Sequence, residues 1–215
     1  MGDLFPAKDV QCGQVEVWAR GQGIGLLIGL DEAGRGPLAG PVVAGAAALA
    51  DPCPIDGLND SKALSGKVRE ILFERIHEEA LAFGVAVVSP EEIDRINILQ
   101  ASLRAMGLAW KQLVDYRKDL AEAVVLVDGN KRAHLPGHID QRPIVKGDAR
   151  SLNIAAASIL AKVTRDRIML KAHETWPQYG FDRHKGYPTA QHRQALRDHG
   201  PCPIHRRSFR MPQRT

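Results

Sequence analysis

Residues 28–43, IGLDEAGRGPLAGPVV, place two adjacent carboxylates at the end of an apolar run. Asp31 and Glu32 are followed almost directly by the turn sequence GRGP at 34–37. A charge at the end of a buried strand is costly unless a partner neutralises it. This stretch therefore predicts a buried strand, a tight turn and a second strand, with a candidate ligand site where the first strand ends.

Outward from this hairpin, strand-like and helix-like segments alternate along the chain. Ser89, followed by Pro90 and Glu92, predicts a capped helix start, and Thr189 predicts another. The order indicates an α/β or α+β sandwich with a mixed sheet and C-terminal helices. We expect strands at 24–31, 41–50, 83–89, 123–129 and 143–148, and helices at 65–82, 89–113, 151–176 and 190–199.

Charge is distributed unevenly over the 215 residues, which carry a formal net charge of +4. From Arg165 to the C-terminus there are eleven Lys or Arg residues against four Asp or Glu residues, whereas the first 164 residues are weakly acidic. A basic C-terminal third suggests a polyanionic partner. A solubilising surface explains the same charge equally well.

Composition excludes several classes of protein. The hydrophobic content of 44% is sufficient for a core, and the apolar runs are too short to span a membrane. Cys12, Cys53 and Cys202 have neither a disulfide framework nor zinc-site spacing, and the N-terminus does not resemble a signal peptide. A reducing, cytoplasmic setting is therefore expected.

A group of carboxylates is expected at the strand ends. Asp31 and Glu32 end the first strand, and Asp128 ends the fourth. If these strands are neighbours, the three acids converge, and hard oxygen ligands without Cys or His favour Mg²⁺ or Mn²⁺. Alternatively, VDGN at 127–130 is an ordinary turn and Glu32 is solvated. For Asp166, helical periodicity alone favours an exposed side chain paired with a neighbouring arginine.

Two further motifs are candidates for substrate contacts. Gly34 and Gly36 permit a close backbone approach, so their N–H groups and the Arg35 side chain suit a phosphate or a sugar hydroxyl. Near the C-terminus, 183–187 combines Arg183, Lys185 and Tyr187, a basic and aromatic group that suits a nucleic-acid backbone and a sugar or base face. A tight hairpin turn and a solvated loop are the simpler alternatives.

In order and spacing, these segments resemble type 2 ribonuclease H, also called ribonuclease HII, of the bacterial type. The resemblance extends from about residue 25 to about residue 209. It rests on the segments GLDEAGRGPLAGPVV, GLNDSKALS, EIDRINILQASLRAM, VLVDGN, VKGDARSLNIAAASILAKVTRDRIM, QYGFDRHKGYPTAQHRQAL and HGPCPIHRRSF. Cys202 stands where Ser or Thr is expected, outside the proposed site.

The resemblance implies a ribonuclease H-like fold, with a mixed central sheet flanked by helices and a C-terminal helical extension. It implies a metal-binding catalytic set for two Mg²⁺ or Mn²⁺ ions, which comprises Asp31, Glu32, Asp128 and Asp166. It also assigns Gly34, Arg35, Gly36, Lys62, Arg183, Lys185 and Tyr187 to substrate binding. The glycine turn matches the element that contacts the ribose 2′-hydroxyl, and Tyr187 matches the tyrosine that packs on the next sugar.

The implied activity is cleavage of the RNA strand of RNA–DNA hybrids and nicking 5′ of single ribonucleotides in duplex DNA, leaving a 5′-phosphate and a 3′-hydroxyl. A flexible leader at 1–22, one catalytic domain at 23–209 and a basic tail at 210–215 are expected. We also expect a monomer without membrane contact, and a contact of the tail with a replication clamp.

Three alternatives remain. A type 3 ribonuclease H has a similar core, but its extra N-terminal domain needs more than the 22 residues before this one. A non-catalytic binder of hybrid duplexes would gain nothing from acids that face phosphate. A metallophosphatase would need histidine ligands near the acids.

Overall fold

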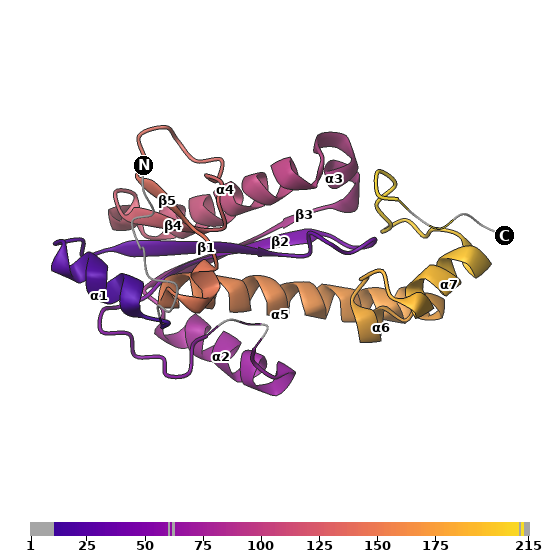
Figure 1. Cartoon of the computed structure of the whole chain (residues 1–215), viewed down its shortest axis with the longest axis horizontal. Coiled ribbons are helices and arrows are strands. Elements are labelled where there is room, and N and C mark those ends of the chain that lie inside the picture. Colours follow the sequence, from indigo (N-terminus) through magenta and orange to yellow (C-terminus); the bar gives the residue numbers. More distant parts are fainter. Residues whose placement is uncertain (1–10, 60, 62, 211, 213–215) are drawn as a thin grey trace.

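One mixed sheet of five strands forms the centre of the protein (Figure 1). The computed structural model describes residues 11–59, 61, 63–210 and 212. The strands lie in the order β3-β2-β1-β4-β5. Their bounds are β1 Leu27–Ala33, β2 Val42–Ala48, β3 Ala82–Val88, β4 Val124–Asp128 and β5 Gln141–Ile144.

Register brings the ends of β1 and β4 together. β1 is antiparallel to β2 and parallel to β4, with Leu30 opposite Val127. The next residue on each strand is therefore an acid, Asp31 on β1 and Asp128 on β4. Because parallel neighbours end at the same edge of a sheet, the two carboxylates lie at one edge, as the sequence predicts for adjacent strands.

Helices cover both faces of the sheet (Figure 1). α4 (Ile98–Tyr116) packs on one face, while α5 (Leu152–Thr175) and α2 (Gly66–Glu79) lie on the other. α5 lies very close to β2, since a Cβ at Gly45 would stand 2.2 Å from the carbonyl oxygen of Ala157. A small residue at this position is therefore needed for the long helix to contact the strand.

The predicted helix at 89–113 is instead two helices, α3 (Pro90–Ile96) and α4. Ser89 caps α3 by accepting a hydrogen bond from the Glu92 N–H at 3.3 Å, as expected. Asn97 has a positive φ of 67° and caps α4, because its Oδ1 accepts from the Gln100 N–H at 3.1 Å. Apolar periodicity continues through this break, so the periodicity alone could not reveal it.

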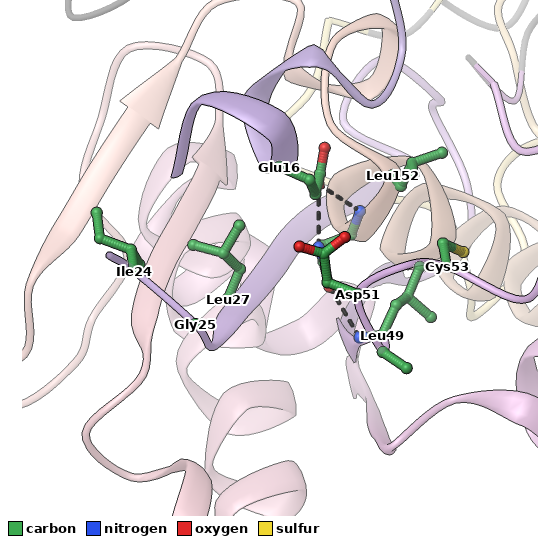
Figure 2. Close-up of a pocket in the computed structure, with 10 residues that line it drawn as sticks. Glu16, Ile24, Gly25, Leu27, Leu49, Asp51, Cys53 and Leu152 are labelled. Carbon is green, nitrogen blue, oxygen red and sulfur yellow. Dashed lines mark hydrogen bonds between the residues drawn. The ribbon is translucent and has the colours of Figure 1, made fainter. Parts of the chain in front are cut away.

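The leader expected at 1–22 contains a helix that its sequence pattern did not predict, α1 (Gln14–Gly21). Two residues of this helix, Val15 and Ala19, are buried. Glu16 points toward the start of α5 (Figure 2). Its Oε1 accepts hydrogen bonds from the Ser151 hydroxyl at 2.6 Å and from the Asn153 side chain at 3.0 Å. The helix is short, so its few buried residues gave too little periodicity to be recognised. Residues 1–10 of the leader lie outside the described residues.

Beyond the sheet, the end of α5 carries the expected C-terminal helical extension (Figure 1). It comprises α6 (Phe181–His184) and α7 (Ala190–His199), together with the short 3-10 turn η3 (Pro177–Tyr179). Thr189 caps α7 as predicted, accepting from the His192 N–H at 3.2 Å. Two further 3-10 turns are η1 (Lys118–Leu120) and η2 (Gly147–Ala149). Across the described part of the chain, no helix has the length and apolar character needed to cross a membrane.

Candidate active site

Asp31 and Glu32 lie near the C-terminal end of β1, directly after the residues of β1 that pair with β4. Asp31 is 5% exposed, and its Oδ1 accepts a hydrogen bond from the Glu32 N–H at 2.7 Å. Glu32 forms an ion pair with Arg35, whose Nη1 lies 3.2 Å from Glu32 Oε1. The neighbouring turn therefore partly neutralises one acid of the pair, while the other has no arginine partner within the described chain.

Asp128 is held by the loop that follows β5. Its Oδ1 accepts from the Gly147 N–H at 2.7 Å. An open pocket of about 280 Å³ contains Asp31, Glu32 and Asp128 in its lining, so the three strand-end acids share one cavity. The convergence predicted from the sequence is therefore present.

Crowding of these acids changes their proton affinity. Burial raises the pKa of Asp31 well above its ordinary value, and the charges of Asp128 and Glu32 raise it further. Burial also raises the pKa of Glu32 above its ordinary value, and the charge of Arg35 offsets part of this increase. Such a site favours the binding of cations or protons, since either relieves the repulsion between carboxylates.

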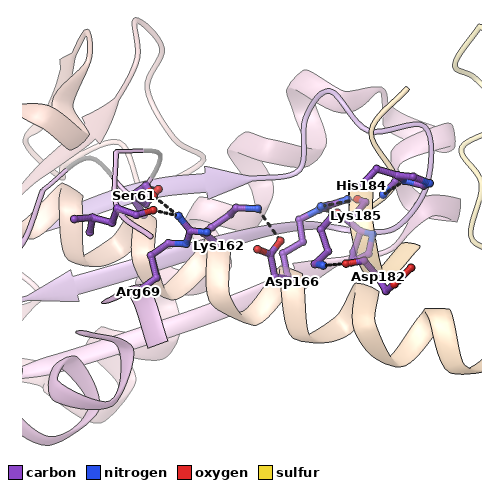
Figure 3. Close-up of polar contacts among 12 residues, drawn as sticks. Ser61, Arg69, Lys162, Asp166, Asp182, His184 and Lys185 are labelled. Atoms are coloured by element: carbon purple, nitrogen blue, oxygen red, sulfur yellow. Dashed lines mark hydrogen bonds and ion pairs between the residues drawn. The ribbon is translucent and has the colours of Figure 1, made fainter. Parts of the chain in front are cut away.

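Asp166 lies on α5 and faces Lys162 (Figure 3). Lys162 Nζ contacts Asp166 Oδ1 at 2.7 Å, and Lys162 lines the pocket of the three acids whereas Asp166 does not. No group of three or more His, Cys, Asp or Glu residues is close enough to hold a metal ion among the residues that the structure describes. The structure thus places three of the four predicted acids in the lining of one pocket and pairs the fourth, Asp166, with Lys162 of the same lining.

The glycine turn and Tyr187 line the same pocket as the acids. Gly34, Arg35 and Gly36 form one wall, and Tyr187 contributes from the loop between α6 and α7. A Cβ on Gly36 would lie 3.7 Å from the Tyr187 ring. Two segments about 150 residues apart in sequence thus meet beside the acids, although Tyr187 itself remains 43% exposed.

The other predicted substrate residues lie elsewhere. Arg183 is exposed, with its Nε 3.8 Å from Asp182 Oδ2, and Lys185 donates to the carbonyl oxygen of Asp182. Neither lines the pocket of the acids. Lys62 lies outside the described residues.

Three pocket residues were missed by the sequence reasoning, namely Ser61, Ser158 and Lys162. The hydroxyls of Ser61 and Ser158 are 2.8 Å apart, and a hydrogen bond from Ser158 lowers the pKa of Asp31. Ser158, Lys162 and Asp166 follow one another at intervals of four residues. This spacing places them on one face of α5, and it is the sequence signal that could have identified them.

A mixed sheet in the order β3-β2-β1-β4-β5, with acids at the adjacent ends of β1 and β4, is the architecture of the ribonuclease H-like nucleases. The family model for ribonuclease HII matches residues 28–211. The chain belongs to the ribonuclease HII family and is a ribonuclease H, an endonuclease that hydrolyses phosphodiester bonds and acts on RNA–DNA substrates.

Curated relatives cover most of this chain. Ribonuclease HII 1 of Methylibium petroleiphilum is 56% identical over 184 residues, covering 86% of this chain and 89% of that protein. The ribonuclease HII of Syntrophotalea carbinolica is 47% identical over 213 residues, covering 98% of this chain and 97% of its own.

Solved structures share the fold. Ribonuclease H2 from Pyrococcus horikoshii OT3 has a TM-score of 0.68 at 28% identity, covering 86% of this chain and 93% of its own. The RNase HII of the Archaeoglobus fulgidus PCNA:RNase HII complex has a TM-score of 0.65 at 25% identity, covering 88% and 98% of the two chains. Bst-RNase HIII in complex with Mn²⁺, at 20% identity and a TM-score of 0.63, covers 83% of this chain and 65% of its own and shows likeness of fold alone.

Proposed function

We propose that this ribonuclease H cleaves the RNA strand of RNA–DNA hybrids and also nicks duplex DNA on the 5′ side of a single embedded ribonucleotide. The products are a 5′-phosphate and a 3′-hydroxyl. One observation carries the proposal: a single pocket is lined by three strand-end acids, by the Gly34–Gly36 backbone and by Tyr187. Groups for hydrolysis and groups for sugar recognition are thus adjacent.

The acids suit divalent cations of the Mg²⁺ or Mn²⁺ type. Carboxylate oxygens are the ligands that these ions prefer. Burial, and then the charges of Asp128 and Glu32, raise the pKa of Asp31, and a bound cation would offset both effects. Asp31, Glu32 and Asp128 would hold the ions, joined by Asp166 once its carboxylate leaves Lys162. Bound by these residues, two such ions would supply a water of lowered pKa for in-line attack and would stabilise charge on the leaving 3′-oxygen.

The remaining pocket residues position the substrate. Gly34 and Gly36 allow the backbone to reach the ribose 2′-hydroxyl, which is the group that distinguishes RNA from DNA. The exposed Tyr187 ring is available to pack on the sugar that follows the ribonucleotide. When only one sugar in a duplex carries a 2′-hydroxyl, these two contacts supply the selectivity.

A direct experiment uses two end-labelled duplexes, one with a single ribonucleotide and one entirely of DNA. Incubation with Mg²⁺ or Mn²⁺ should nick the first duplex on the 5′ side of the ribonucleotide and leave the second intact. Ligation of the nick identifies the 5′-phosphate and 3′-hydroxyl ends. Cleavage of a continuous RNA–DNA hybrid without nicking at the single ribonucleotide would contradict the proposal and leave only the general ribonuclease H activity.

A monomeric state, a cytoplasmic location and a clamp contact through 210–215 stay predictions for this chain. The structure of an archaeal RNase HII in complex with PCNA supports testing the clamp contact. Deletion of the tail, followed by a clamp pull-down, tests that contact separately from catalysis.

A further inference from the structure

Two arginines are buried beneath the glycine turn. Arg165 on α5 is 1% exposed, and Arg206, beyond α7, is fully buried. Neither forms an ion pair with a carboxylate in the described part of the chain, and burial lowers the pKa of both. A buried charge without a counter-charge is costly, so the groups that solvate it indicate what it holds in place.

The hydrogen bonds of the Arg206 guanidinium all go to carbonyl oxygens of the glycine turn and of the segment that follows it, up to residue 41. Its guanidinium donates to Gly34 O at 2.6 Å and to Arg35 O at 3.0 Å. Three more bonds reach Pro37 O at 2.8 Å, Gly40 O at 2.9 Å and Pro41 O at 3.1 Å. One side chain thus orients five of the peptide groups between residues 34 and 42.

The orientation of these carbonyls decides where the amides of the turn point. In a trans peptide, C=O and N–H point in opposite directions, so the N–H groups of Arg35 and Gly36 point away from Arg206. No described residue accepts a hydrogen bond from either N–H group. The turn lines the pocket whereas Arg206 does not, so both donors are directed to the pocket side.

Arg165 connects this turn to the loop that carries Tyr187. Its Nε and Nη2 donate to Pro41 O at 3.0 Å and Ala39 O at 3.1 Å. Its Nη1 donates to Lys185 O at 3.1 Å, and its guanidinium carbon lies 6.0 Å from the centre of the Tyr187 ring. A side chain at Gly34 would collide with Arg165, since a Cβ there would stand 2.1 Å from Nε.

We propose that Arg206 and Arg165 are positioning residues for ribonucleotide recognition. Arg206 presents the Arg35 and Gly36 amides to the ribose 2′-hydroxyl, and Arg165 fixes the distance from this turn to Tyr187. The inference rests on the proposed function, because it assigns a mechanism to selectivity for the single ribonucleotide. Together the two arginines hold the glycine turn and the Tyr187 loop, which make the two sugar contacts, in fixed positions relative to each other.

Arg206→Lys tests the first half, because a lysine keeps the charge but cannot reach five carbonyl groups. The readouts are KM and kcat for the single-ribonucleotide duplex and the inhibition constant of the all-DNA duplex. We expect KM to rise about tenfold or more as charge-assisted hydrogen bonds are lost. The inhibition constant should stay within about twofold, because phosphate contacts dominate the binding of DNA.

KM and the inhibition constant do not depend on the folded fraction of the preparation, so a merely structural role would lower the apparent kcat and leave both unchanged. That outcome would overturn the proposal for Arg206. Arg207→Lys is the matched control, since Arg207 is the exposed neighbour and should keep wild-type constants. If the wild-type protein itself does not cut the single-ribonucleotide duplex, the proposed function fails and the inference fails with it.

Arg165→Lys tests the second half in a double-mutant cycle with Tyr187→Ala. Loss of the bond to Lys185 O should reduce kcat/KM at the single ribonucleotide about tenfold in the wild-type background and much less when Tyr187 is absent. Equal effects in both backgrounds would overturn the role in positioning Tyr187. If Arg206→Lys lacks a cooperative unfolding transition, the KM comparison is made with Arg165→Lys instead. This variant keeps all five hydrogen bonds of Arg206, and an unchanged KM for it would refute the proposal that the two arginines position the sugar contacts.

Discussion

Asp31 is buried beside two other carboxylates, and its raised pKa makes its ionised form unfavourable in the folded, metal-free protein. The native state then binds more protons than the unfolded chain above the ordinary pKa of an aspartate. Stability therefore falls as the pH rises through that range. Asp31→Asn removes this charge and should keep or raise the melting temperature in EDTA.

The same variant should lose cleavage by about 10²–10³-fold or more, as is typical when a preorganised charged group is removed from an active site. Cleavage assays beside thermal unfolding in EDTA measure both effects. Asp115→Asn is a suitable control, because Asp115 is an exposed partner of Lys111 and does not line the pocket. Near wild-type cleavage by Asp31→Asn would show that the four-acid assignment is wrong.

Tyr187 offers a second test at the level of one residue. Loss of its ring from a sugar contact should cost about 1–3 kcal/mol, by analogy with stacking of bases on aromatic side chains. Tyr187→Ala should therefore reduce cleavage at a single ribonucleotide about tenfold to a hundredfold, and Tyr187→Phe should recover part of it. Parallel rate measurements decide the matter, and equal rates for all three proteins would place the recognition of the junction elsewhere.

Among elements, the loop with Tyr187 is fixed to α7 and the C-terminal segment by two histidines. His192 Nδ1 lies 3.0 Å from Tyr187 O, and His192 Nε2 lies 3.0 Å from His205 Nε2. His205 Nδ1 accepts from the Cys202 N–H at 2.9 Å. These contacts assign one proton to each ring, since His205 Nε2–H then donates to His192, whose Nδ1–H donates to the carbonyl group.

The pKa of both His192 and His205 is lowered to about 4, mainly by burial and in part by the charge of His184, which stacks on His192. Between about pH 6.5 and pH 4 the unfolded chain binds more protons than the folded one. The stabilisation from neutral histidines is therefore complete above pH 6.5 and is lost as the pH falls.

Urea unfolding should accordingly show a decrease of about 2 kcal/mol or more between pH 7.5 and pH 5 from this pair. His192→Asn should flatten that dependence, because Asn keeps a donor near the position of Nδ1 and does not titrate. His138→Asn, at an exposed histidine, serves as the control. An unchanged slope in His192→Asn would mean that other groups cause the acid sensitivity.

At the scale of the whole molecule, fewer basic residues of the C-terminal third are available on the surface than the sequence count indicates. Arg165 and Arg206 belong to its eleven basic residues but are buried and bind carbonyl groups, so they do not contact phosphates. The rest of the positive excess should give sequence-independent binding, with the logarithm of affinity falling by about 0.9 per phosphate contact for each unit of log salt.

Binding titrations of an RNA–DNA hybrid at several salt concentrations measure this slope. Truncation after Phe209 removes Arg210 and Arg214 and should reduce the slope only slightly, by about two contacts at most. A salt-independent affinity would contradict the view that this surface binds phosphates.

The sequence by itself determined the local features of this protein. Ser89 and Thr189 correctly predicted helix starts, because capping depends on residues within one turn. Asp31, Glu32 and Asp128 were recognisable as strand-end acids because each lies where a continuous apolar run stops. Gly34, Gly36 and Tyr187 were identified from their motifs, and the fold class followed from the order of elements.

The tertiary structure alone decided how buried charges are satisfied and which elements meet. Arg206 bonds to Gly34, 172 positions away, and nothing in the local pattern around HRRSF indicates a buried arginine. Likewise, the position of α5 against the sheet decides that Lys162 lines the pocket of the acids whereas Asp166 does not. Periodicity encodes which face of an element is buried, whereas the partner of a buried polar group is set by contacts between segments far apart in the chain.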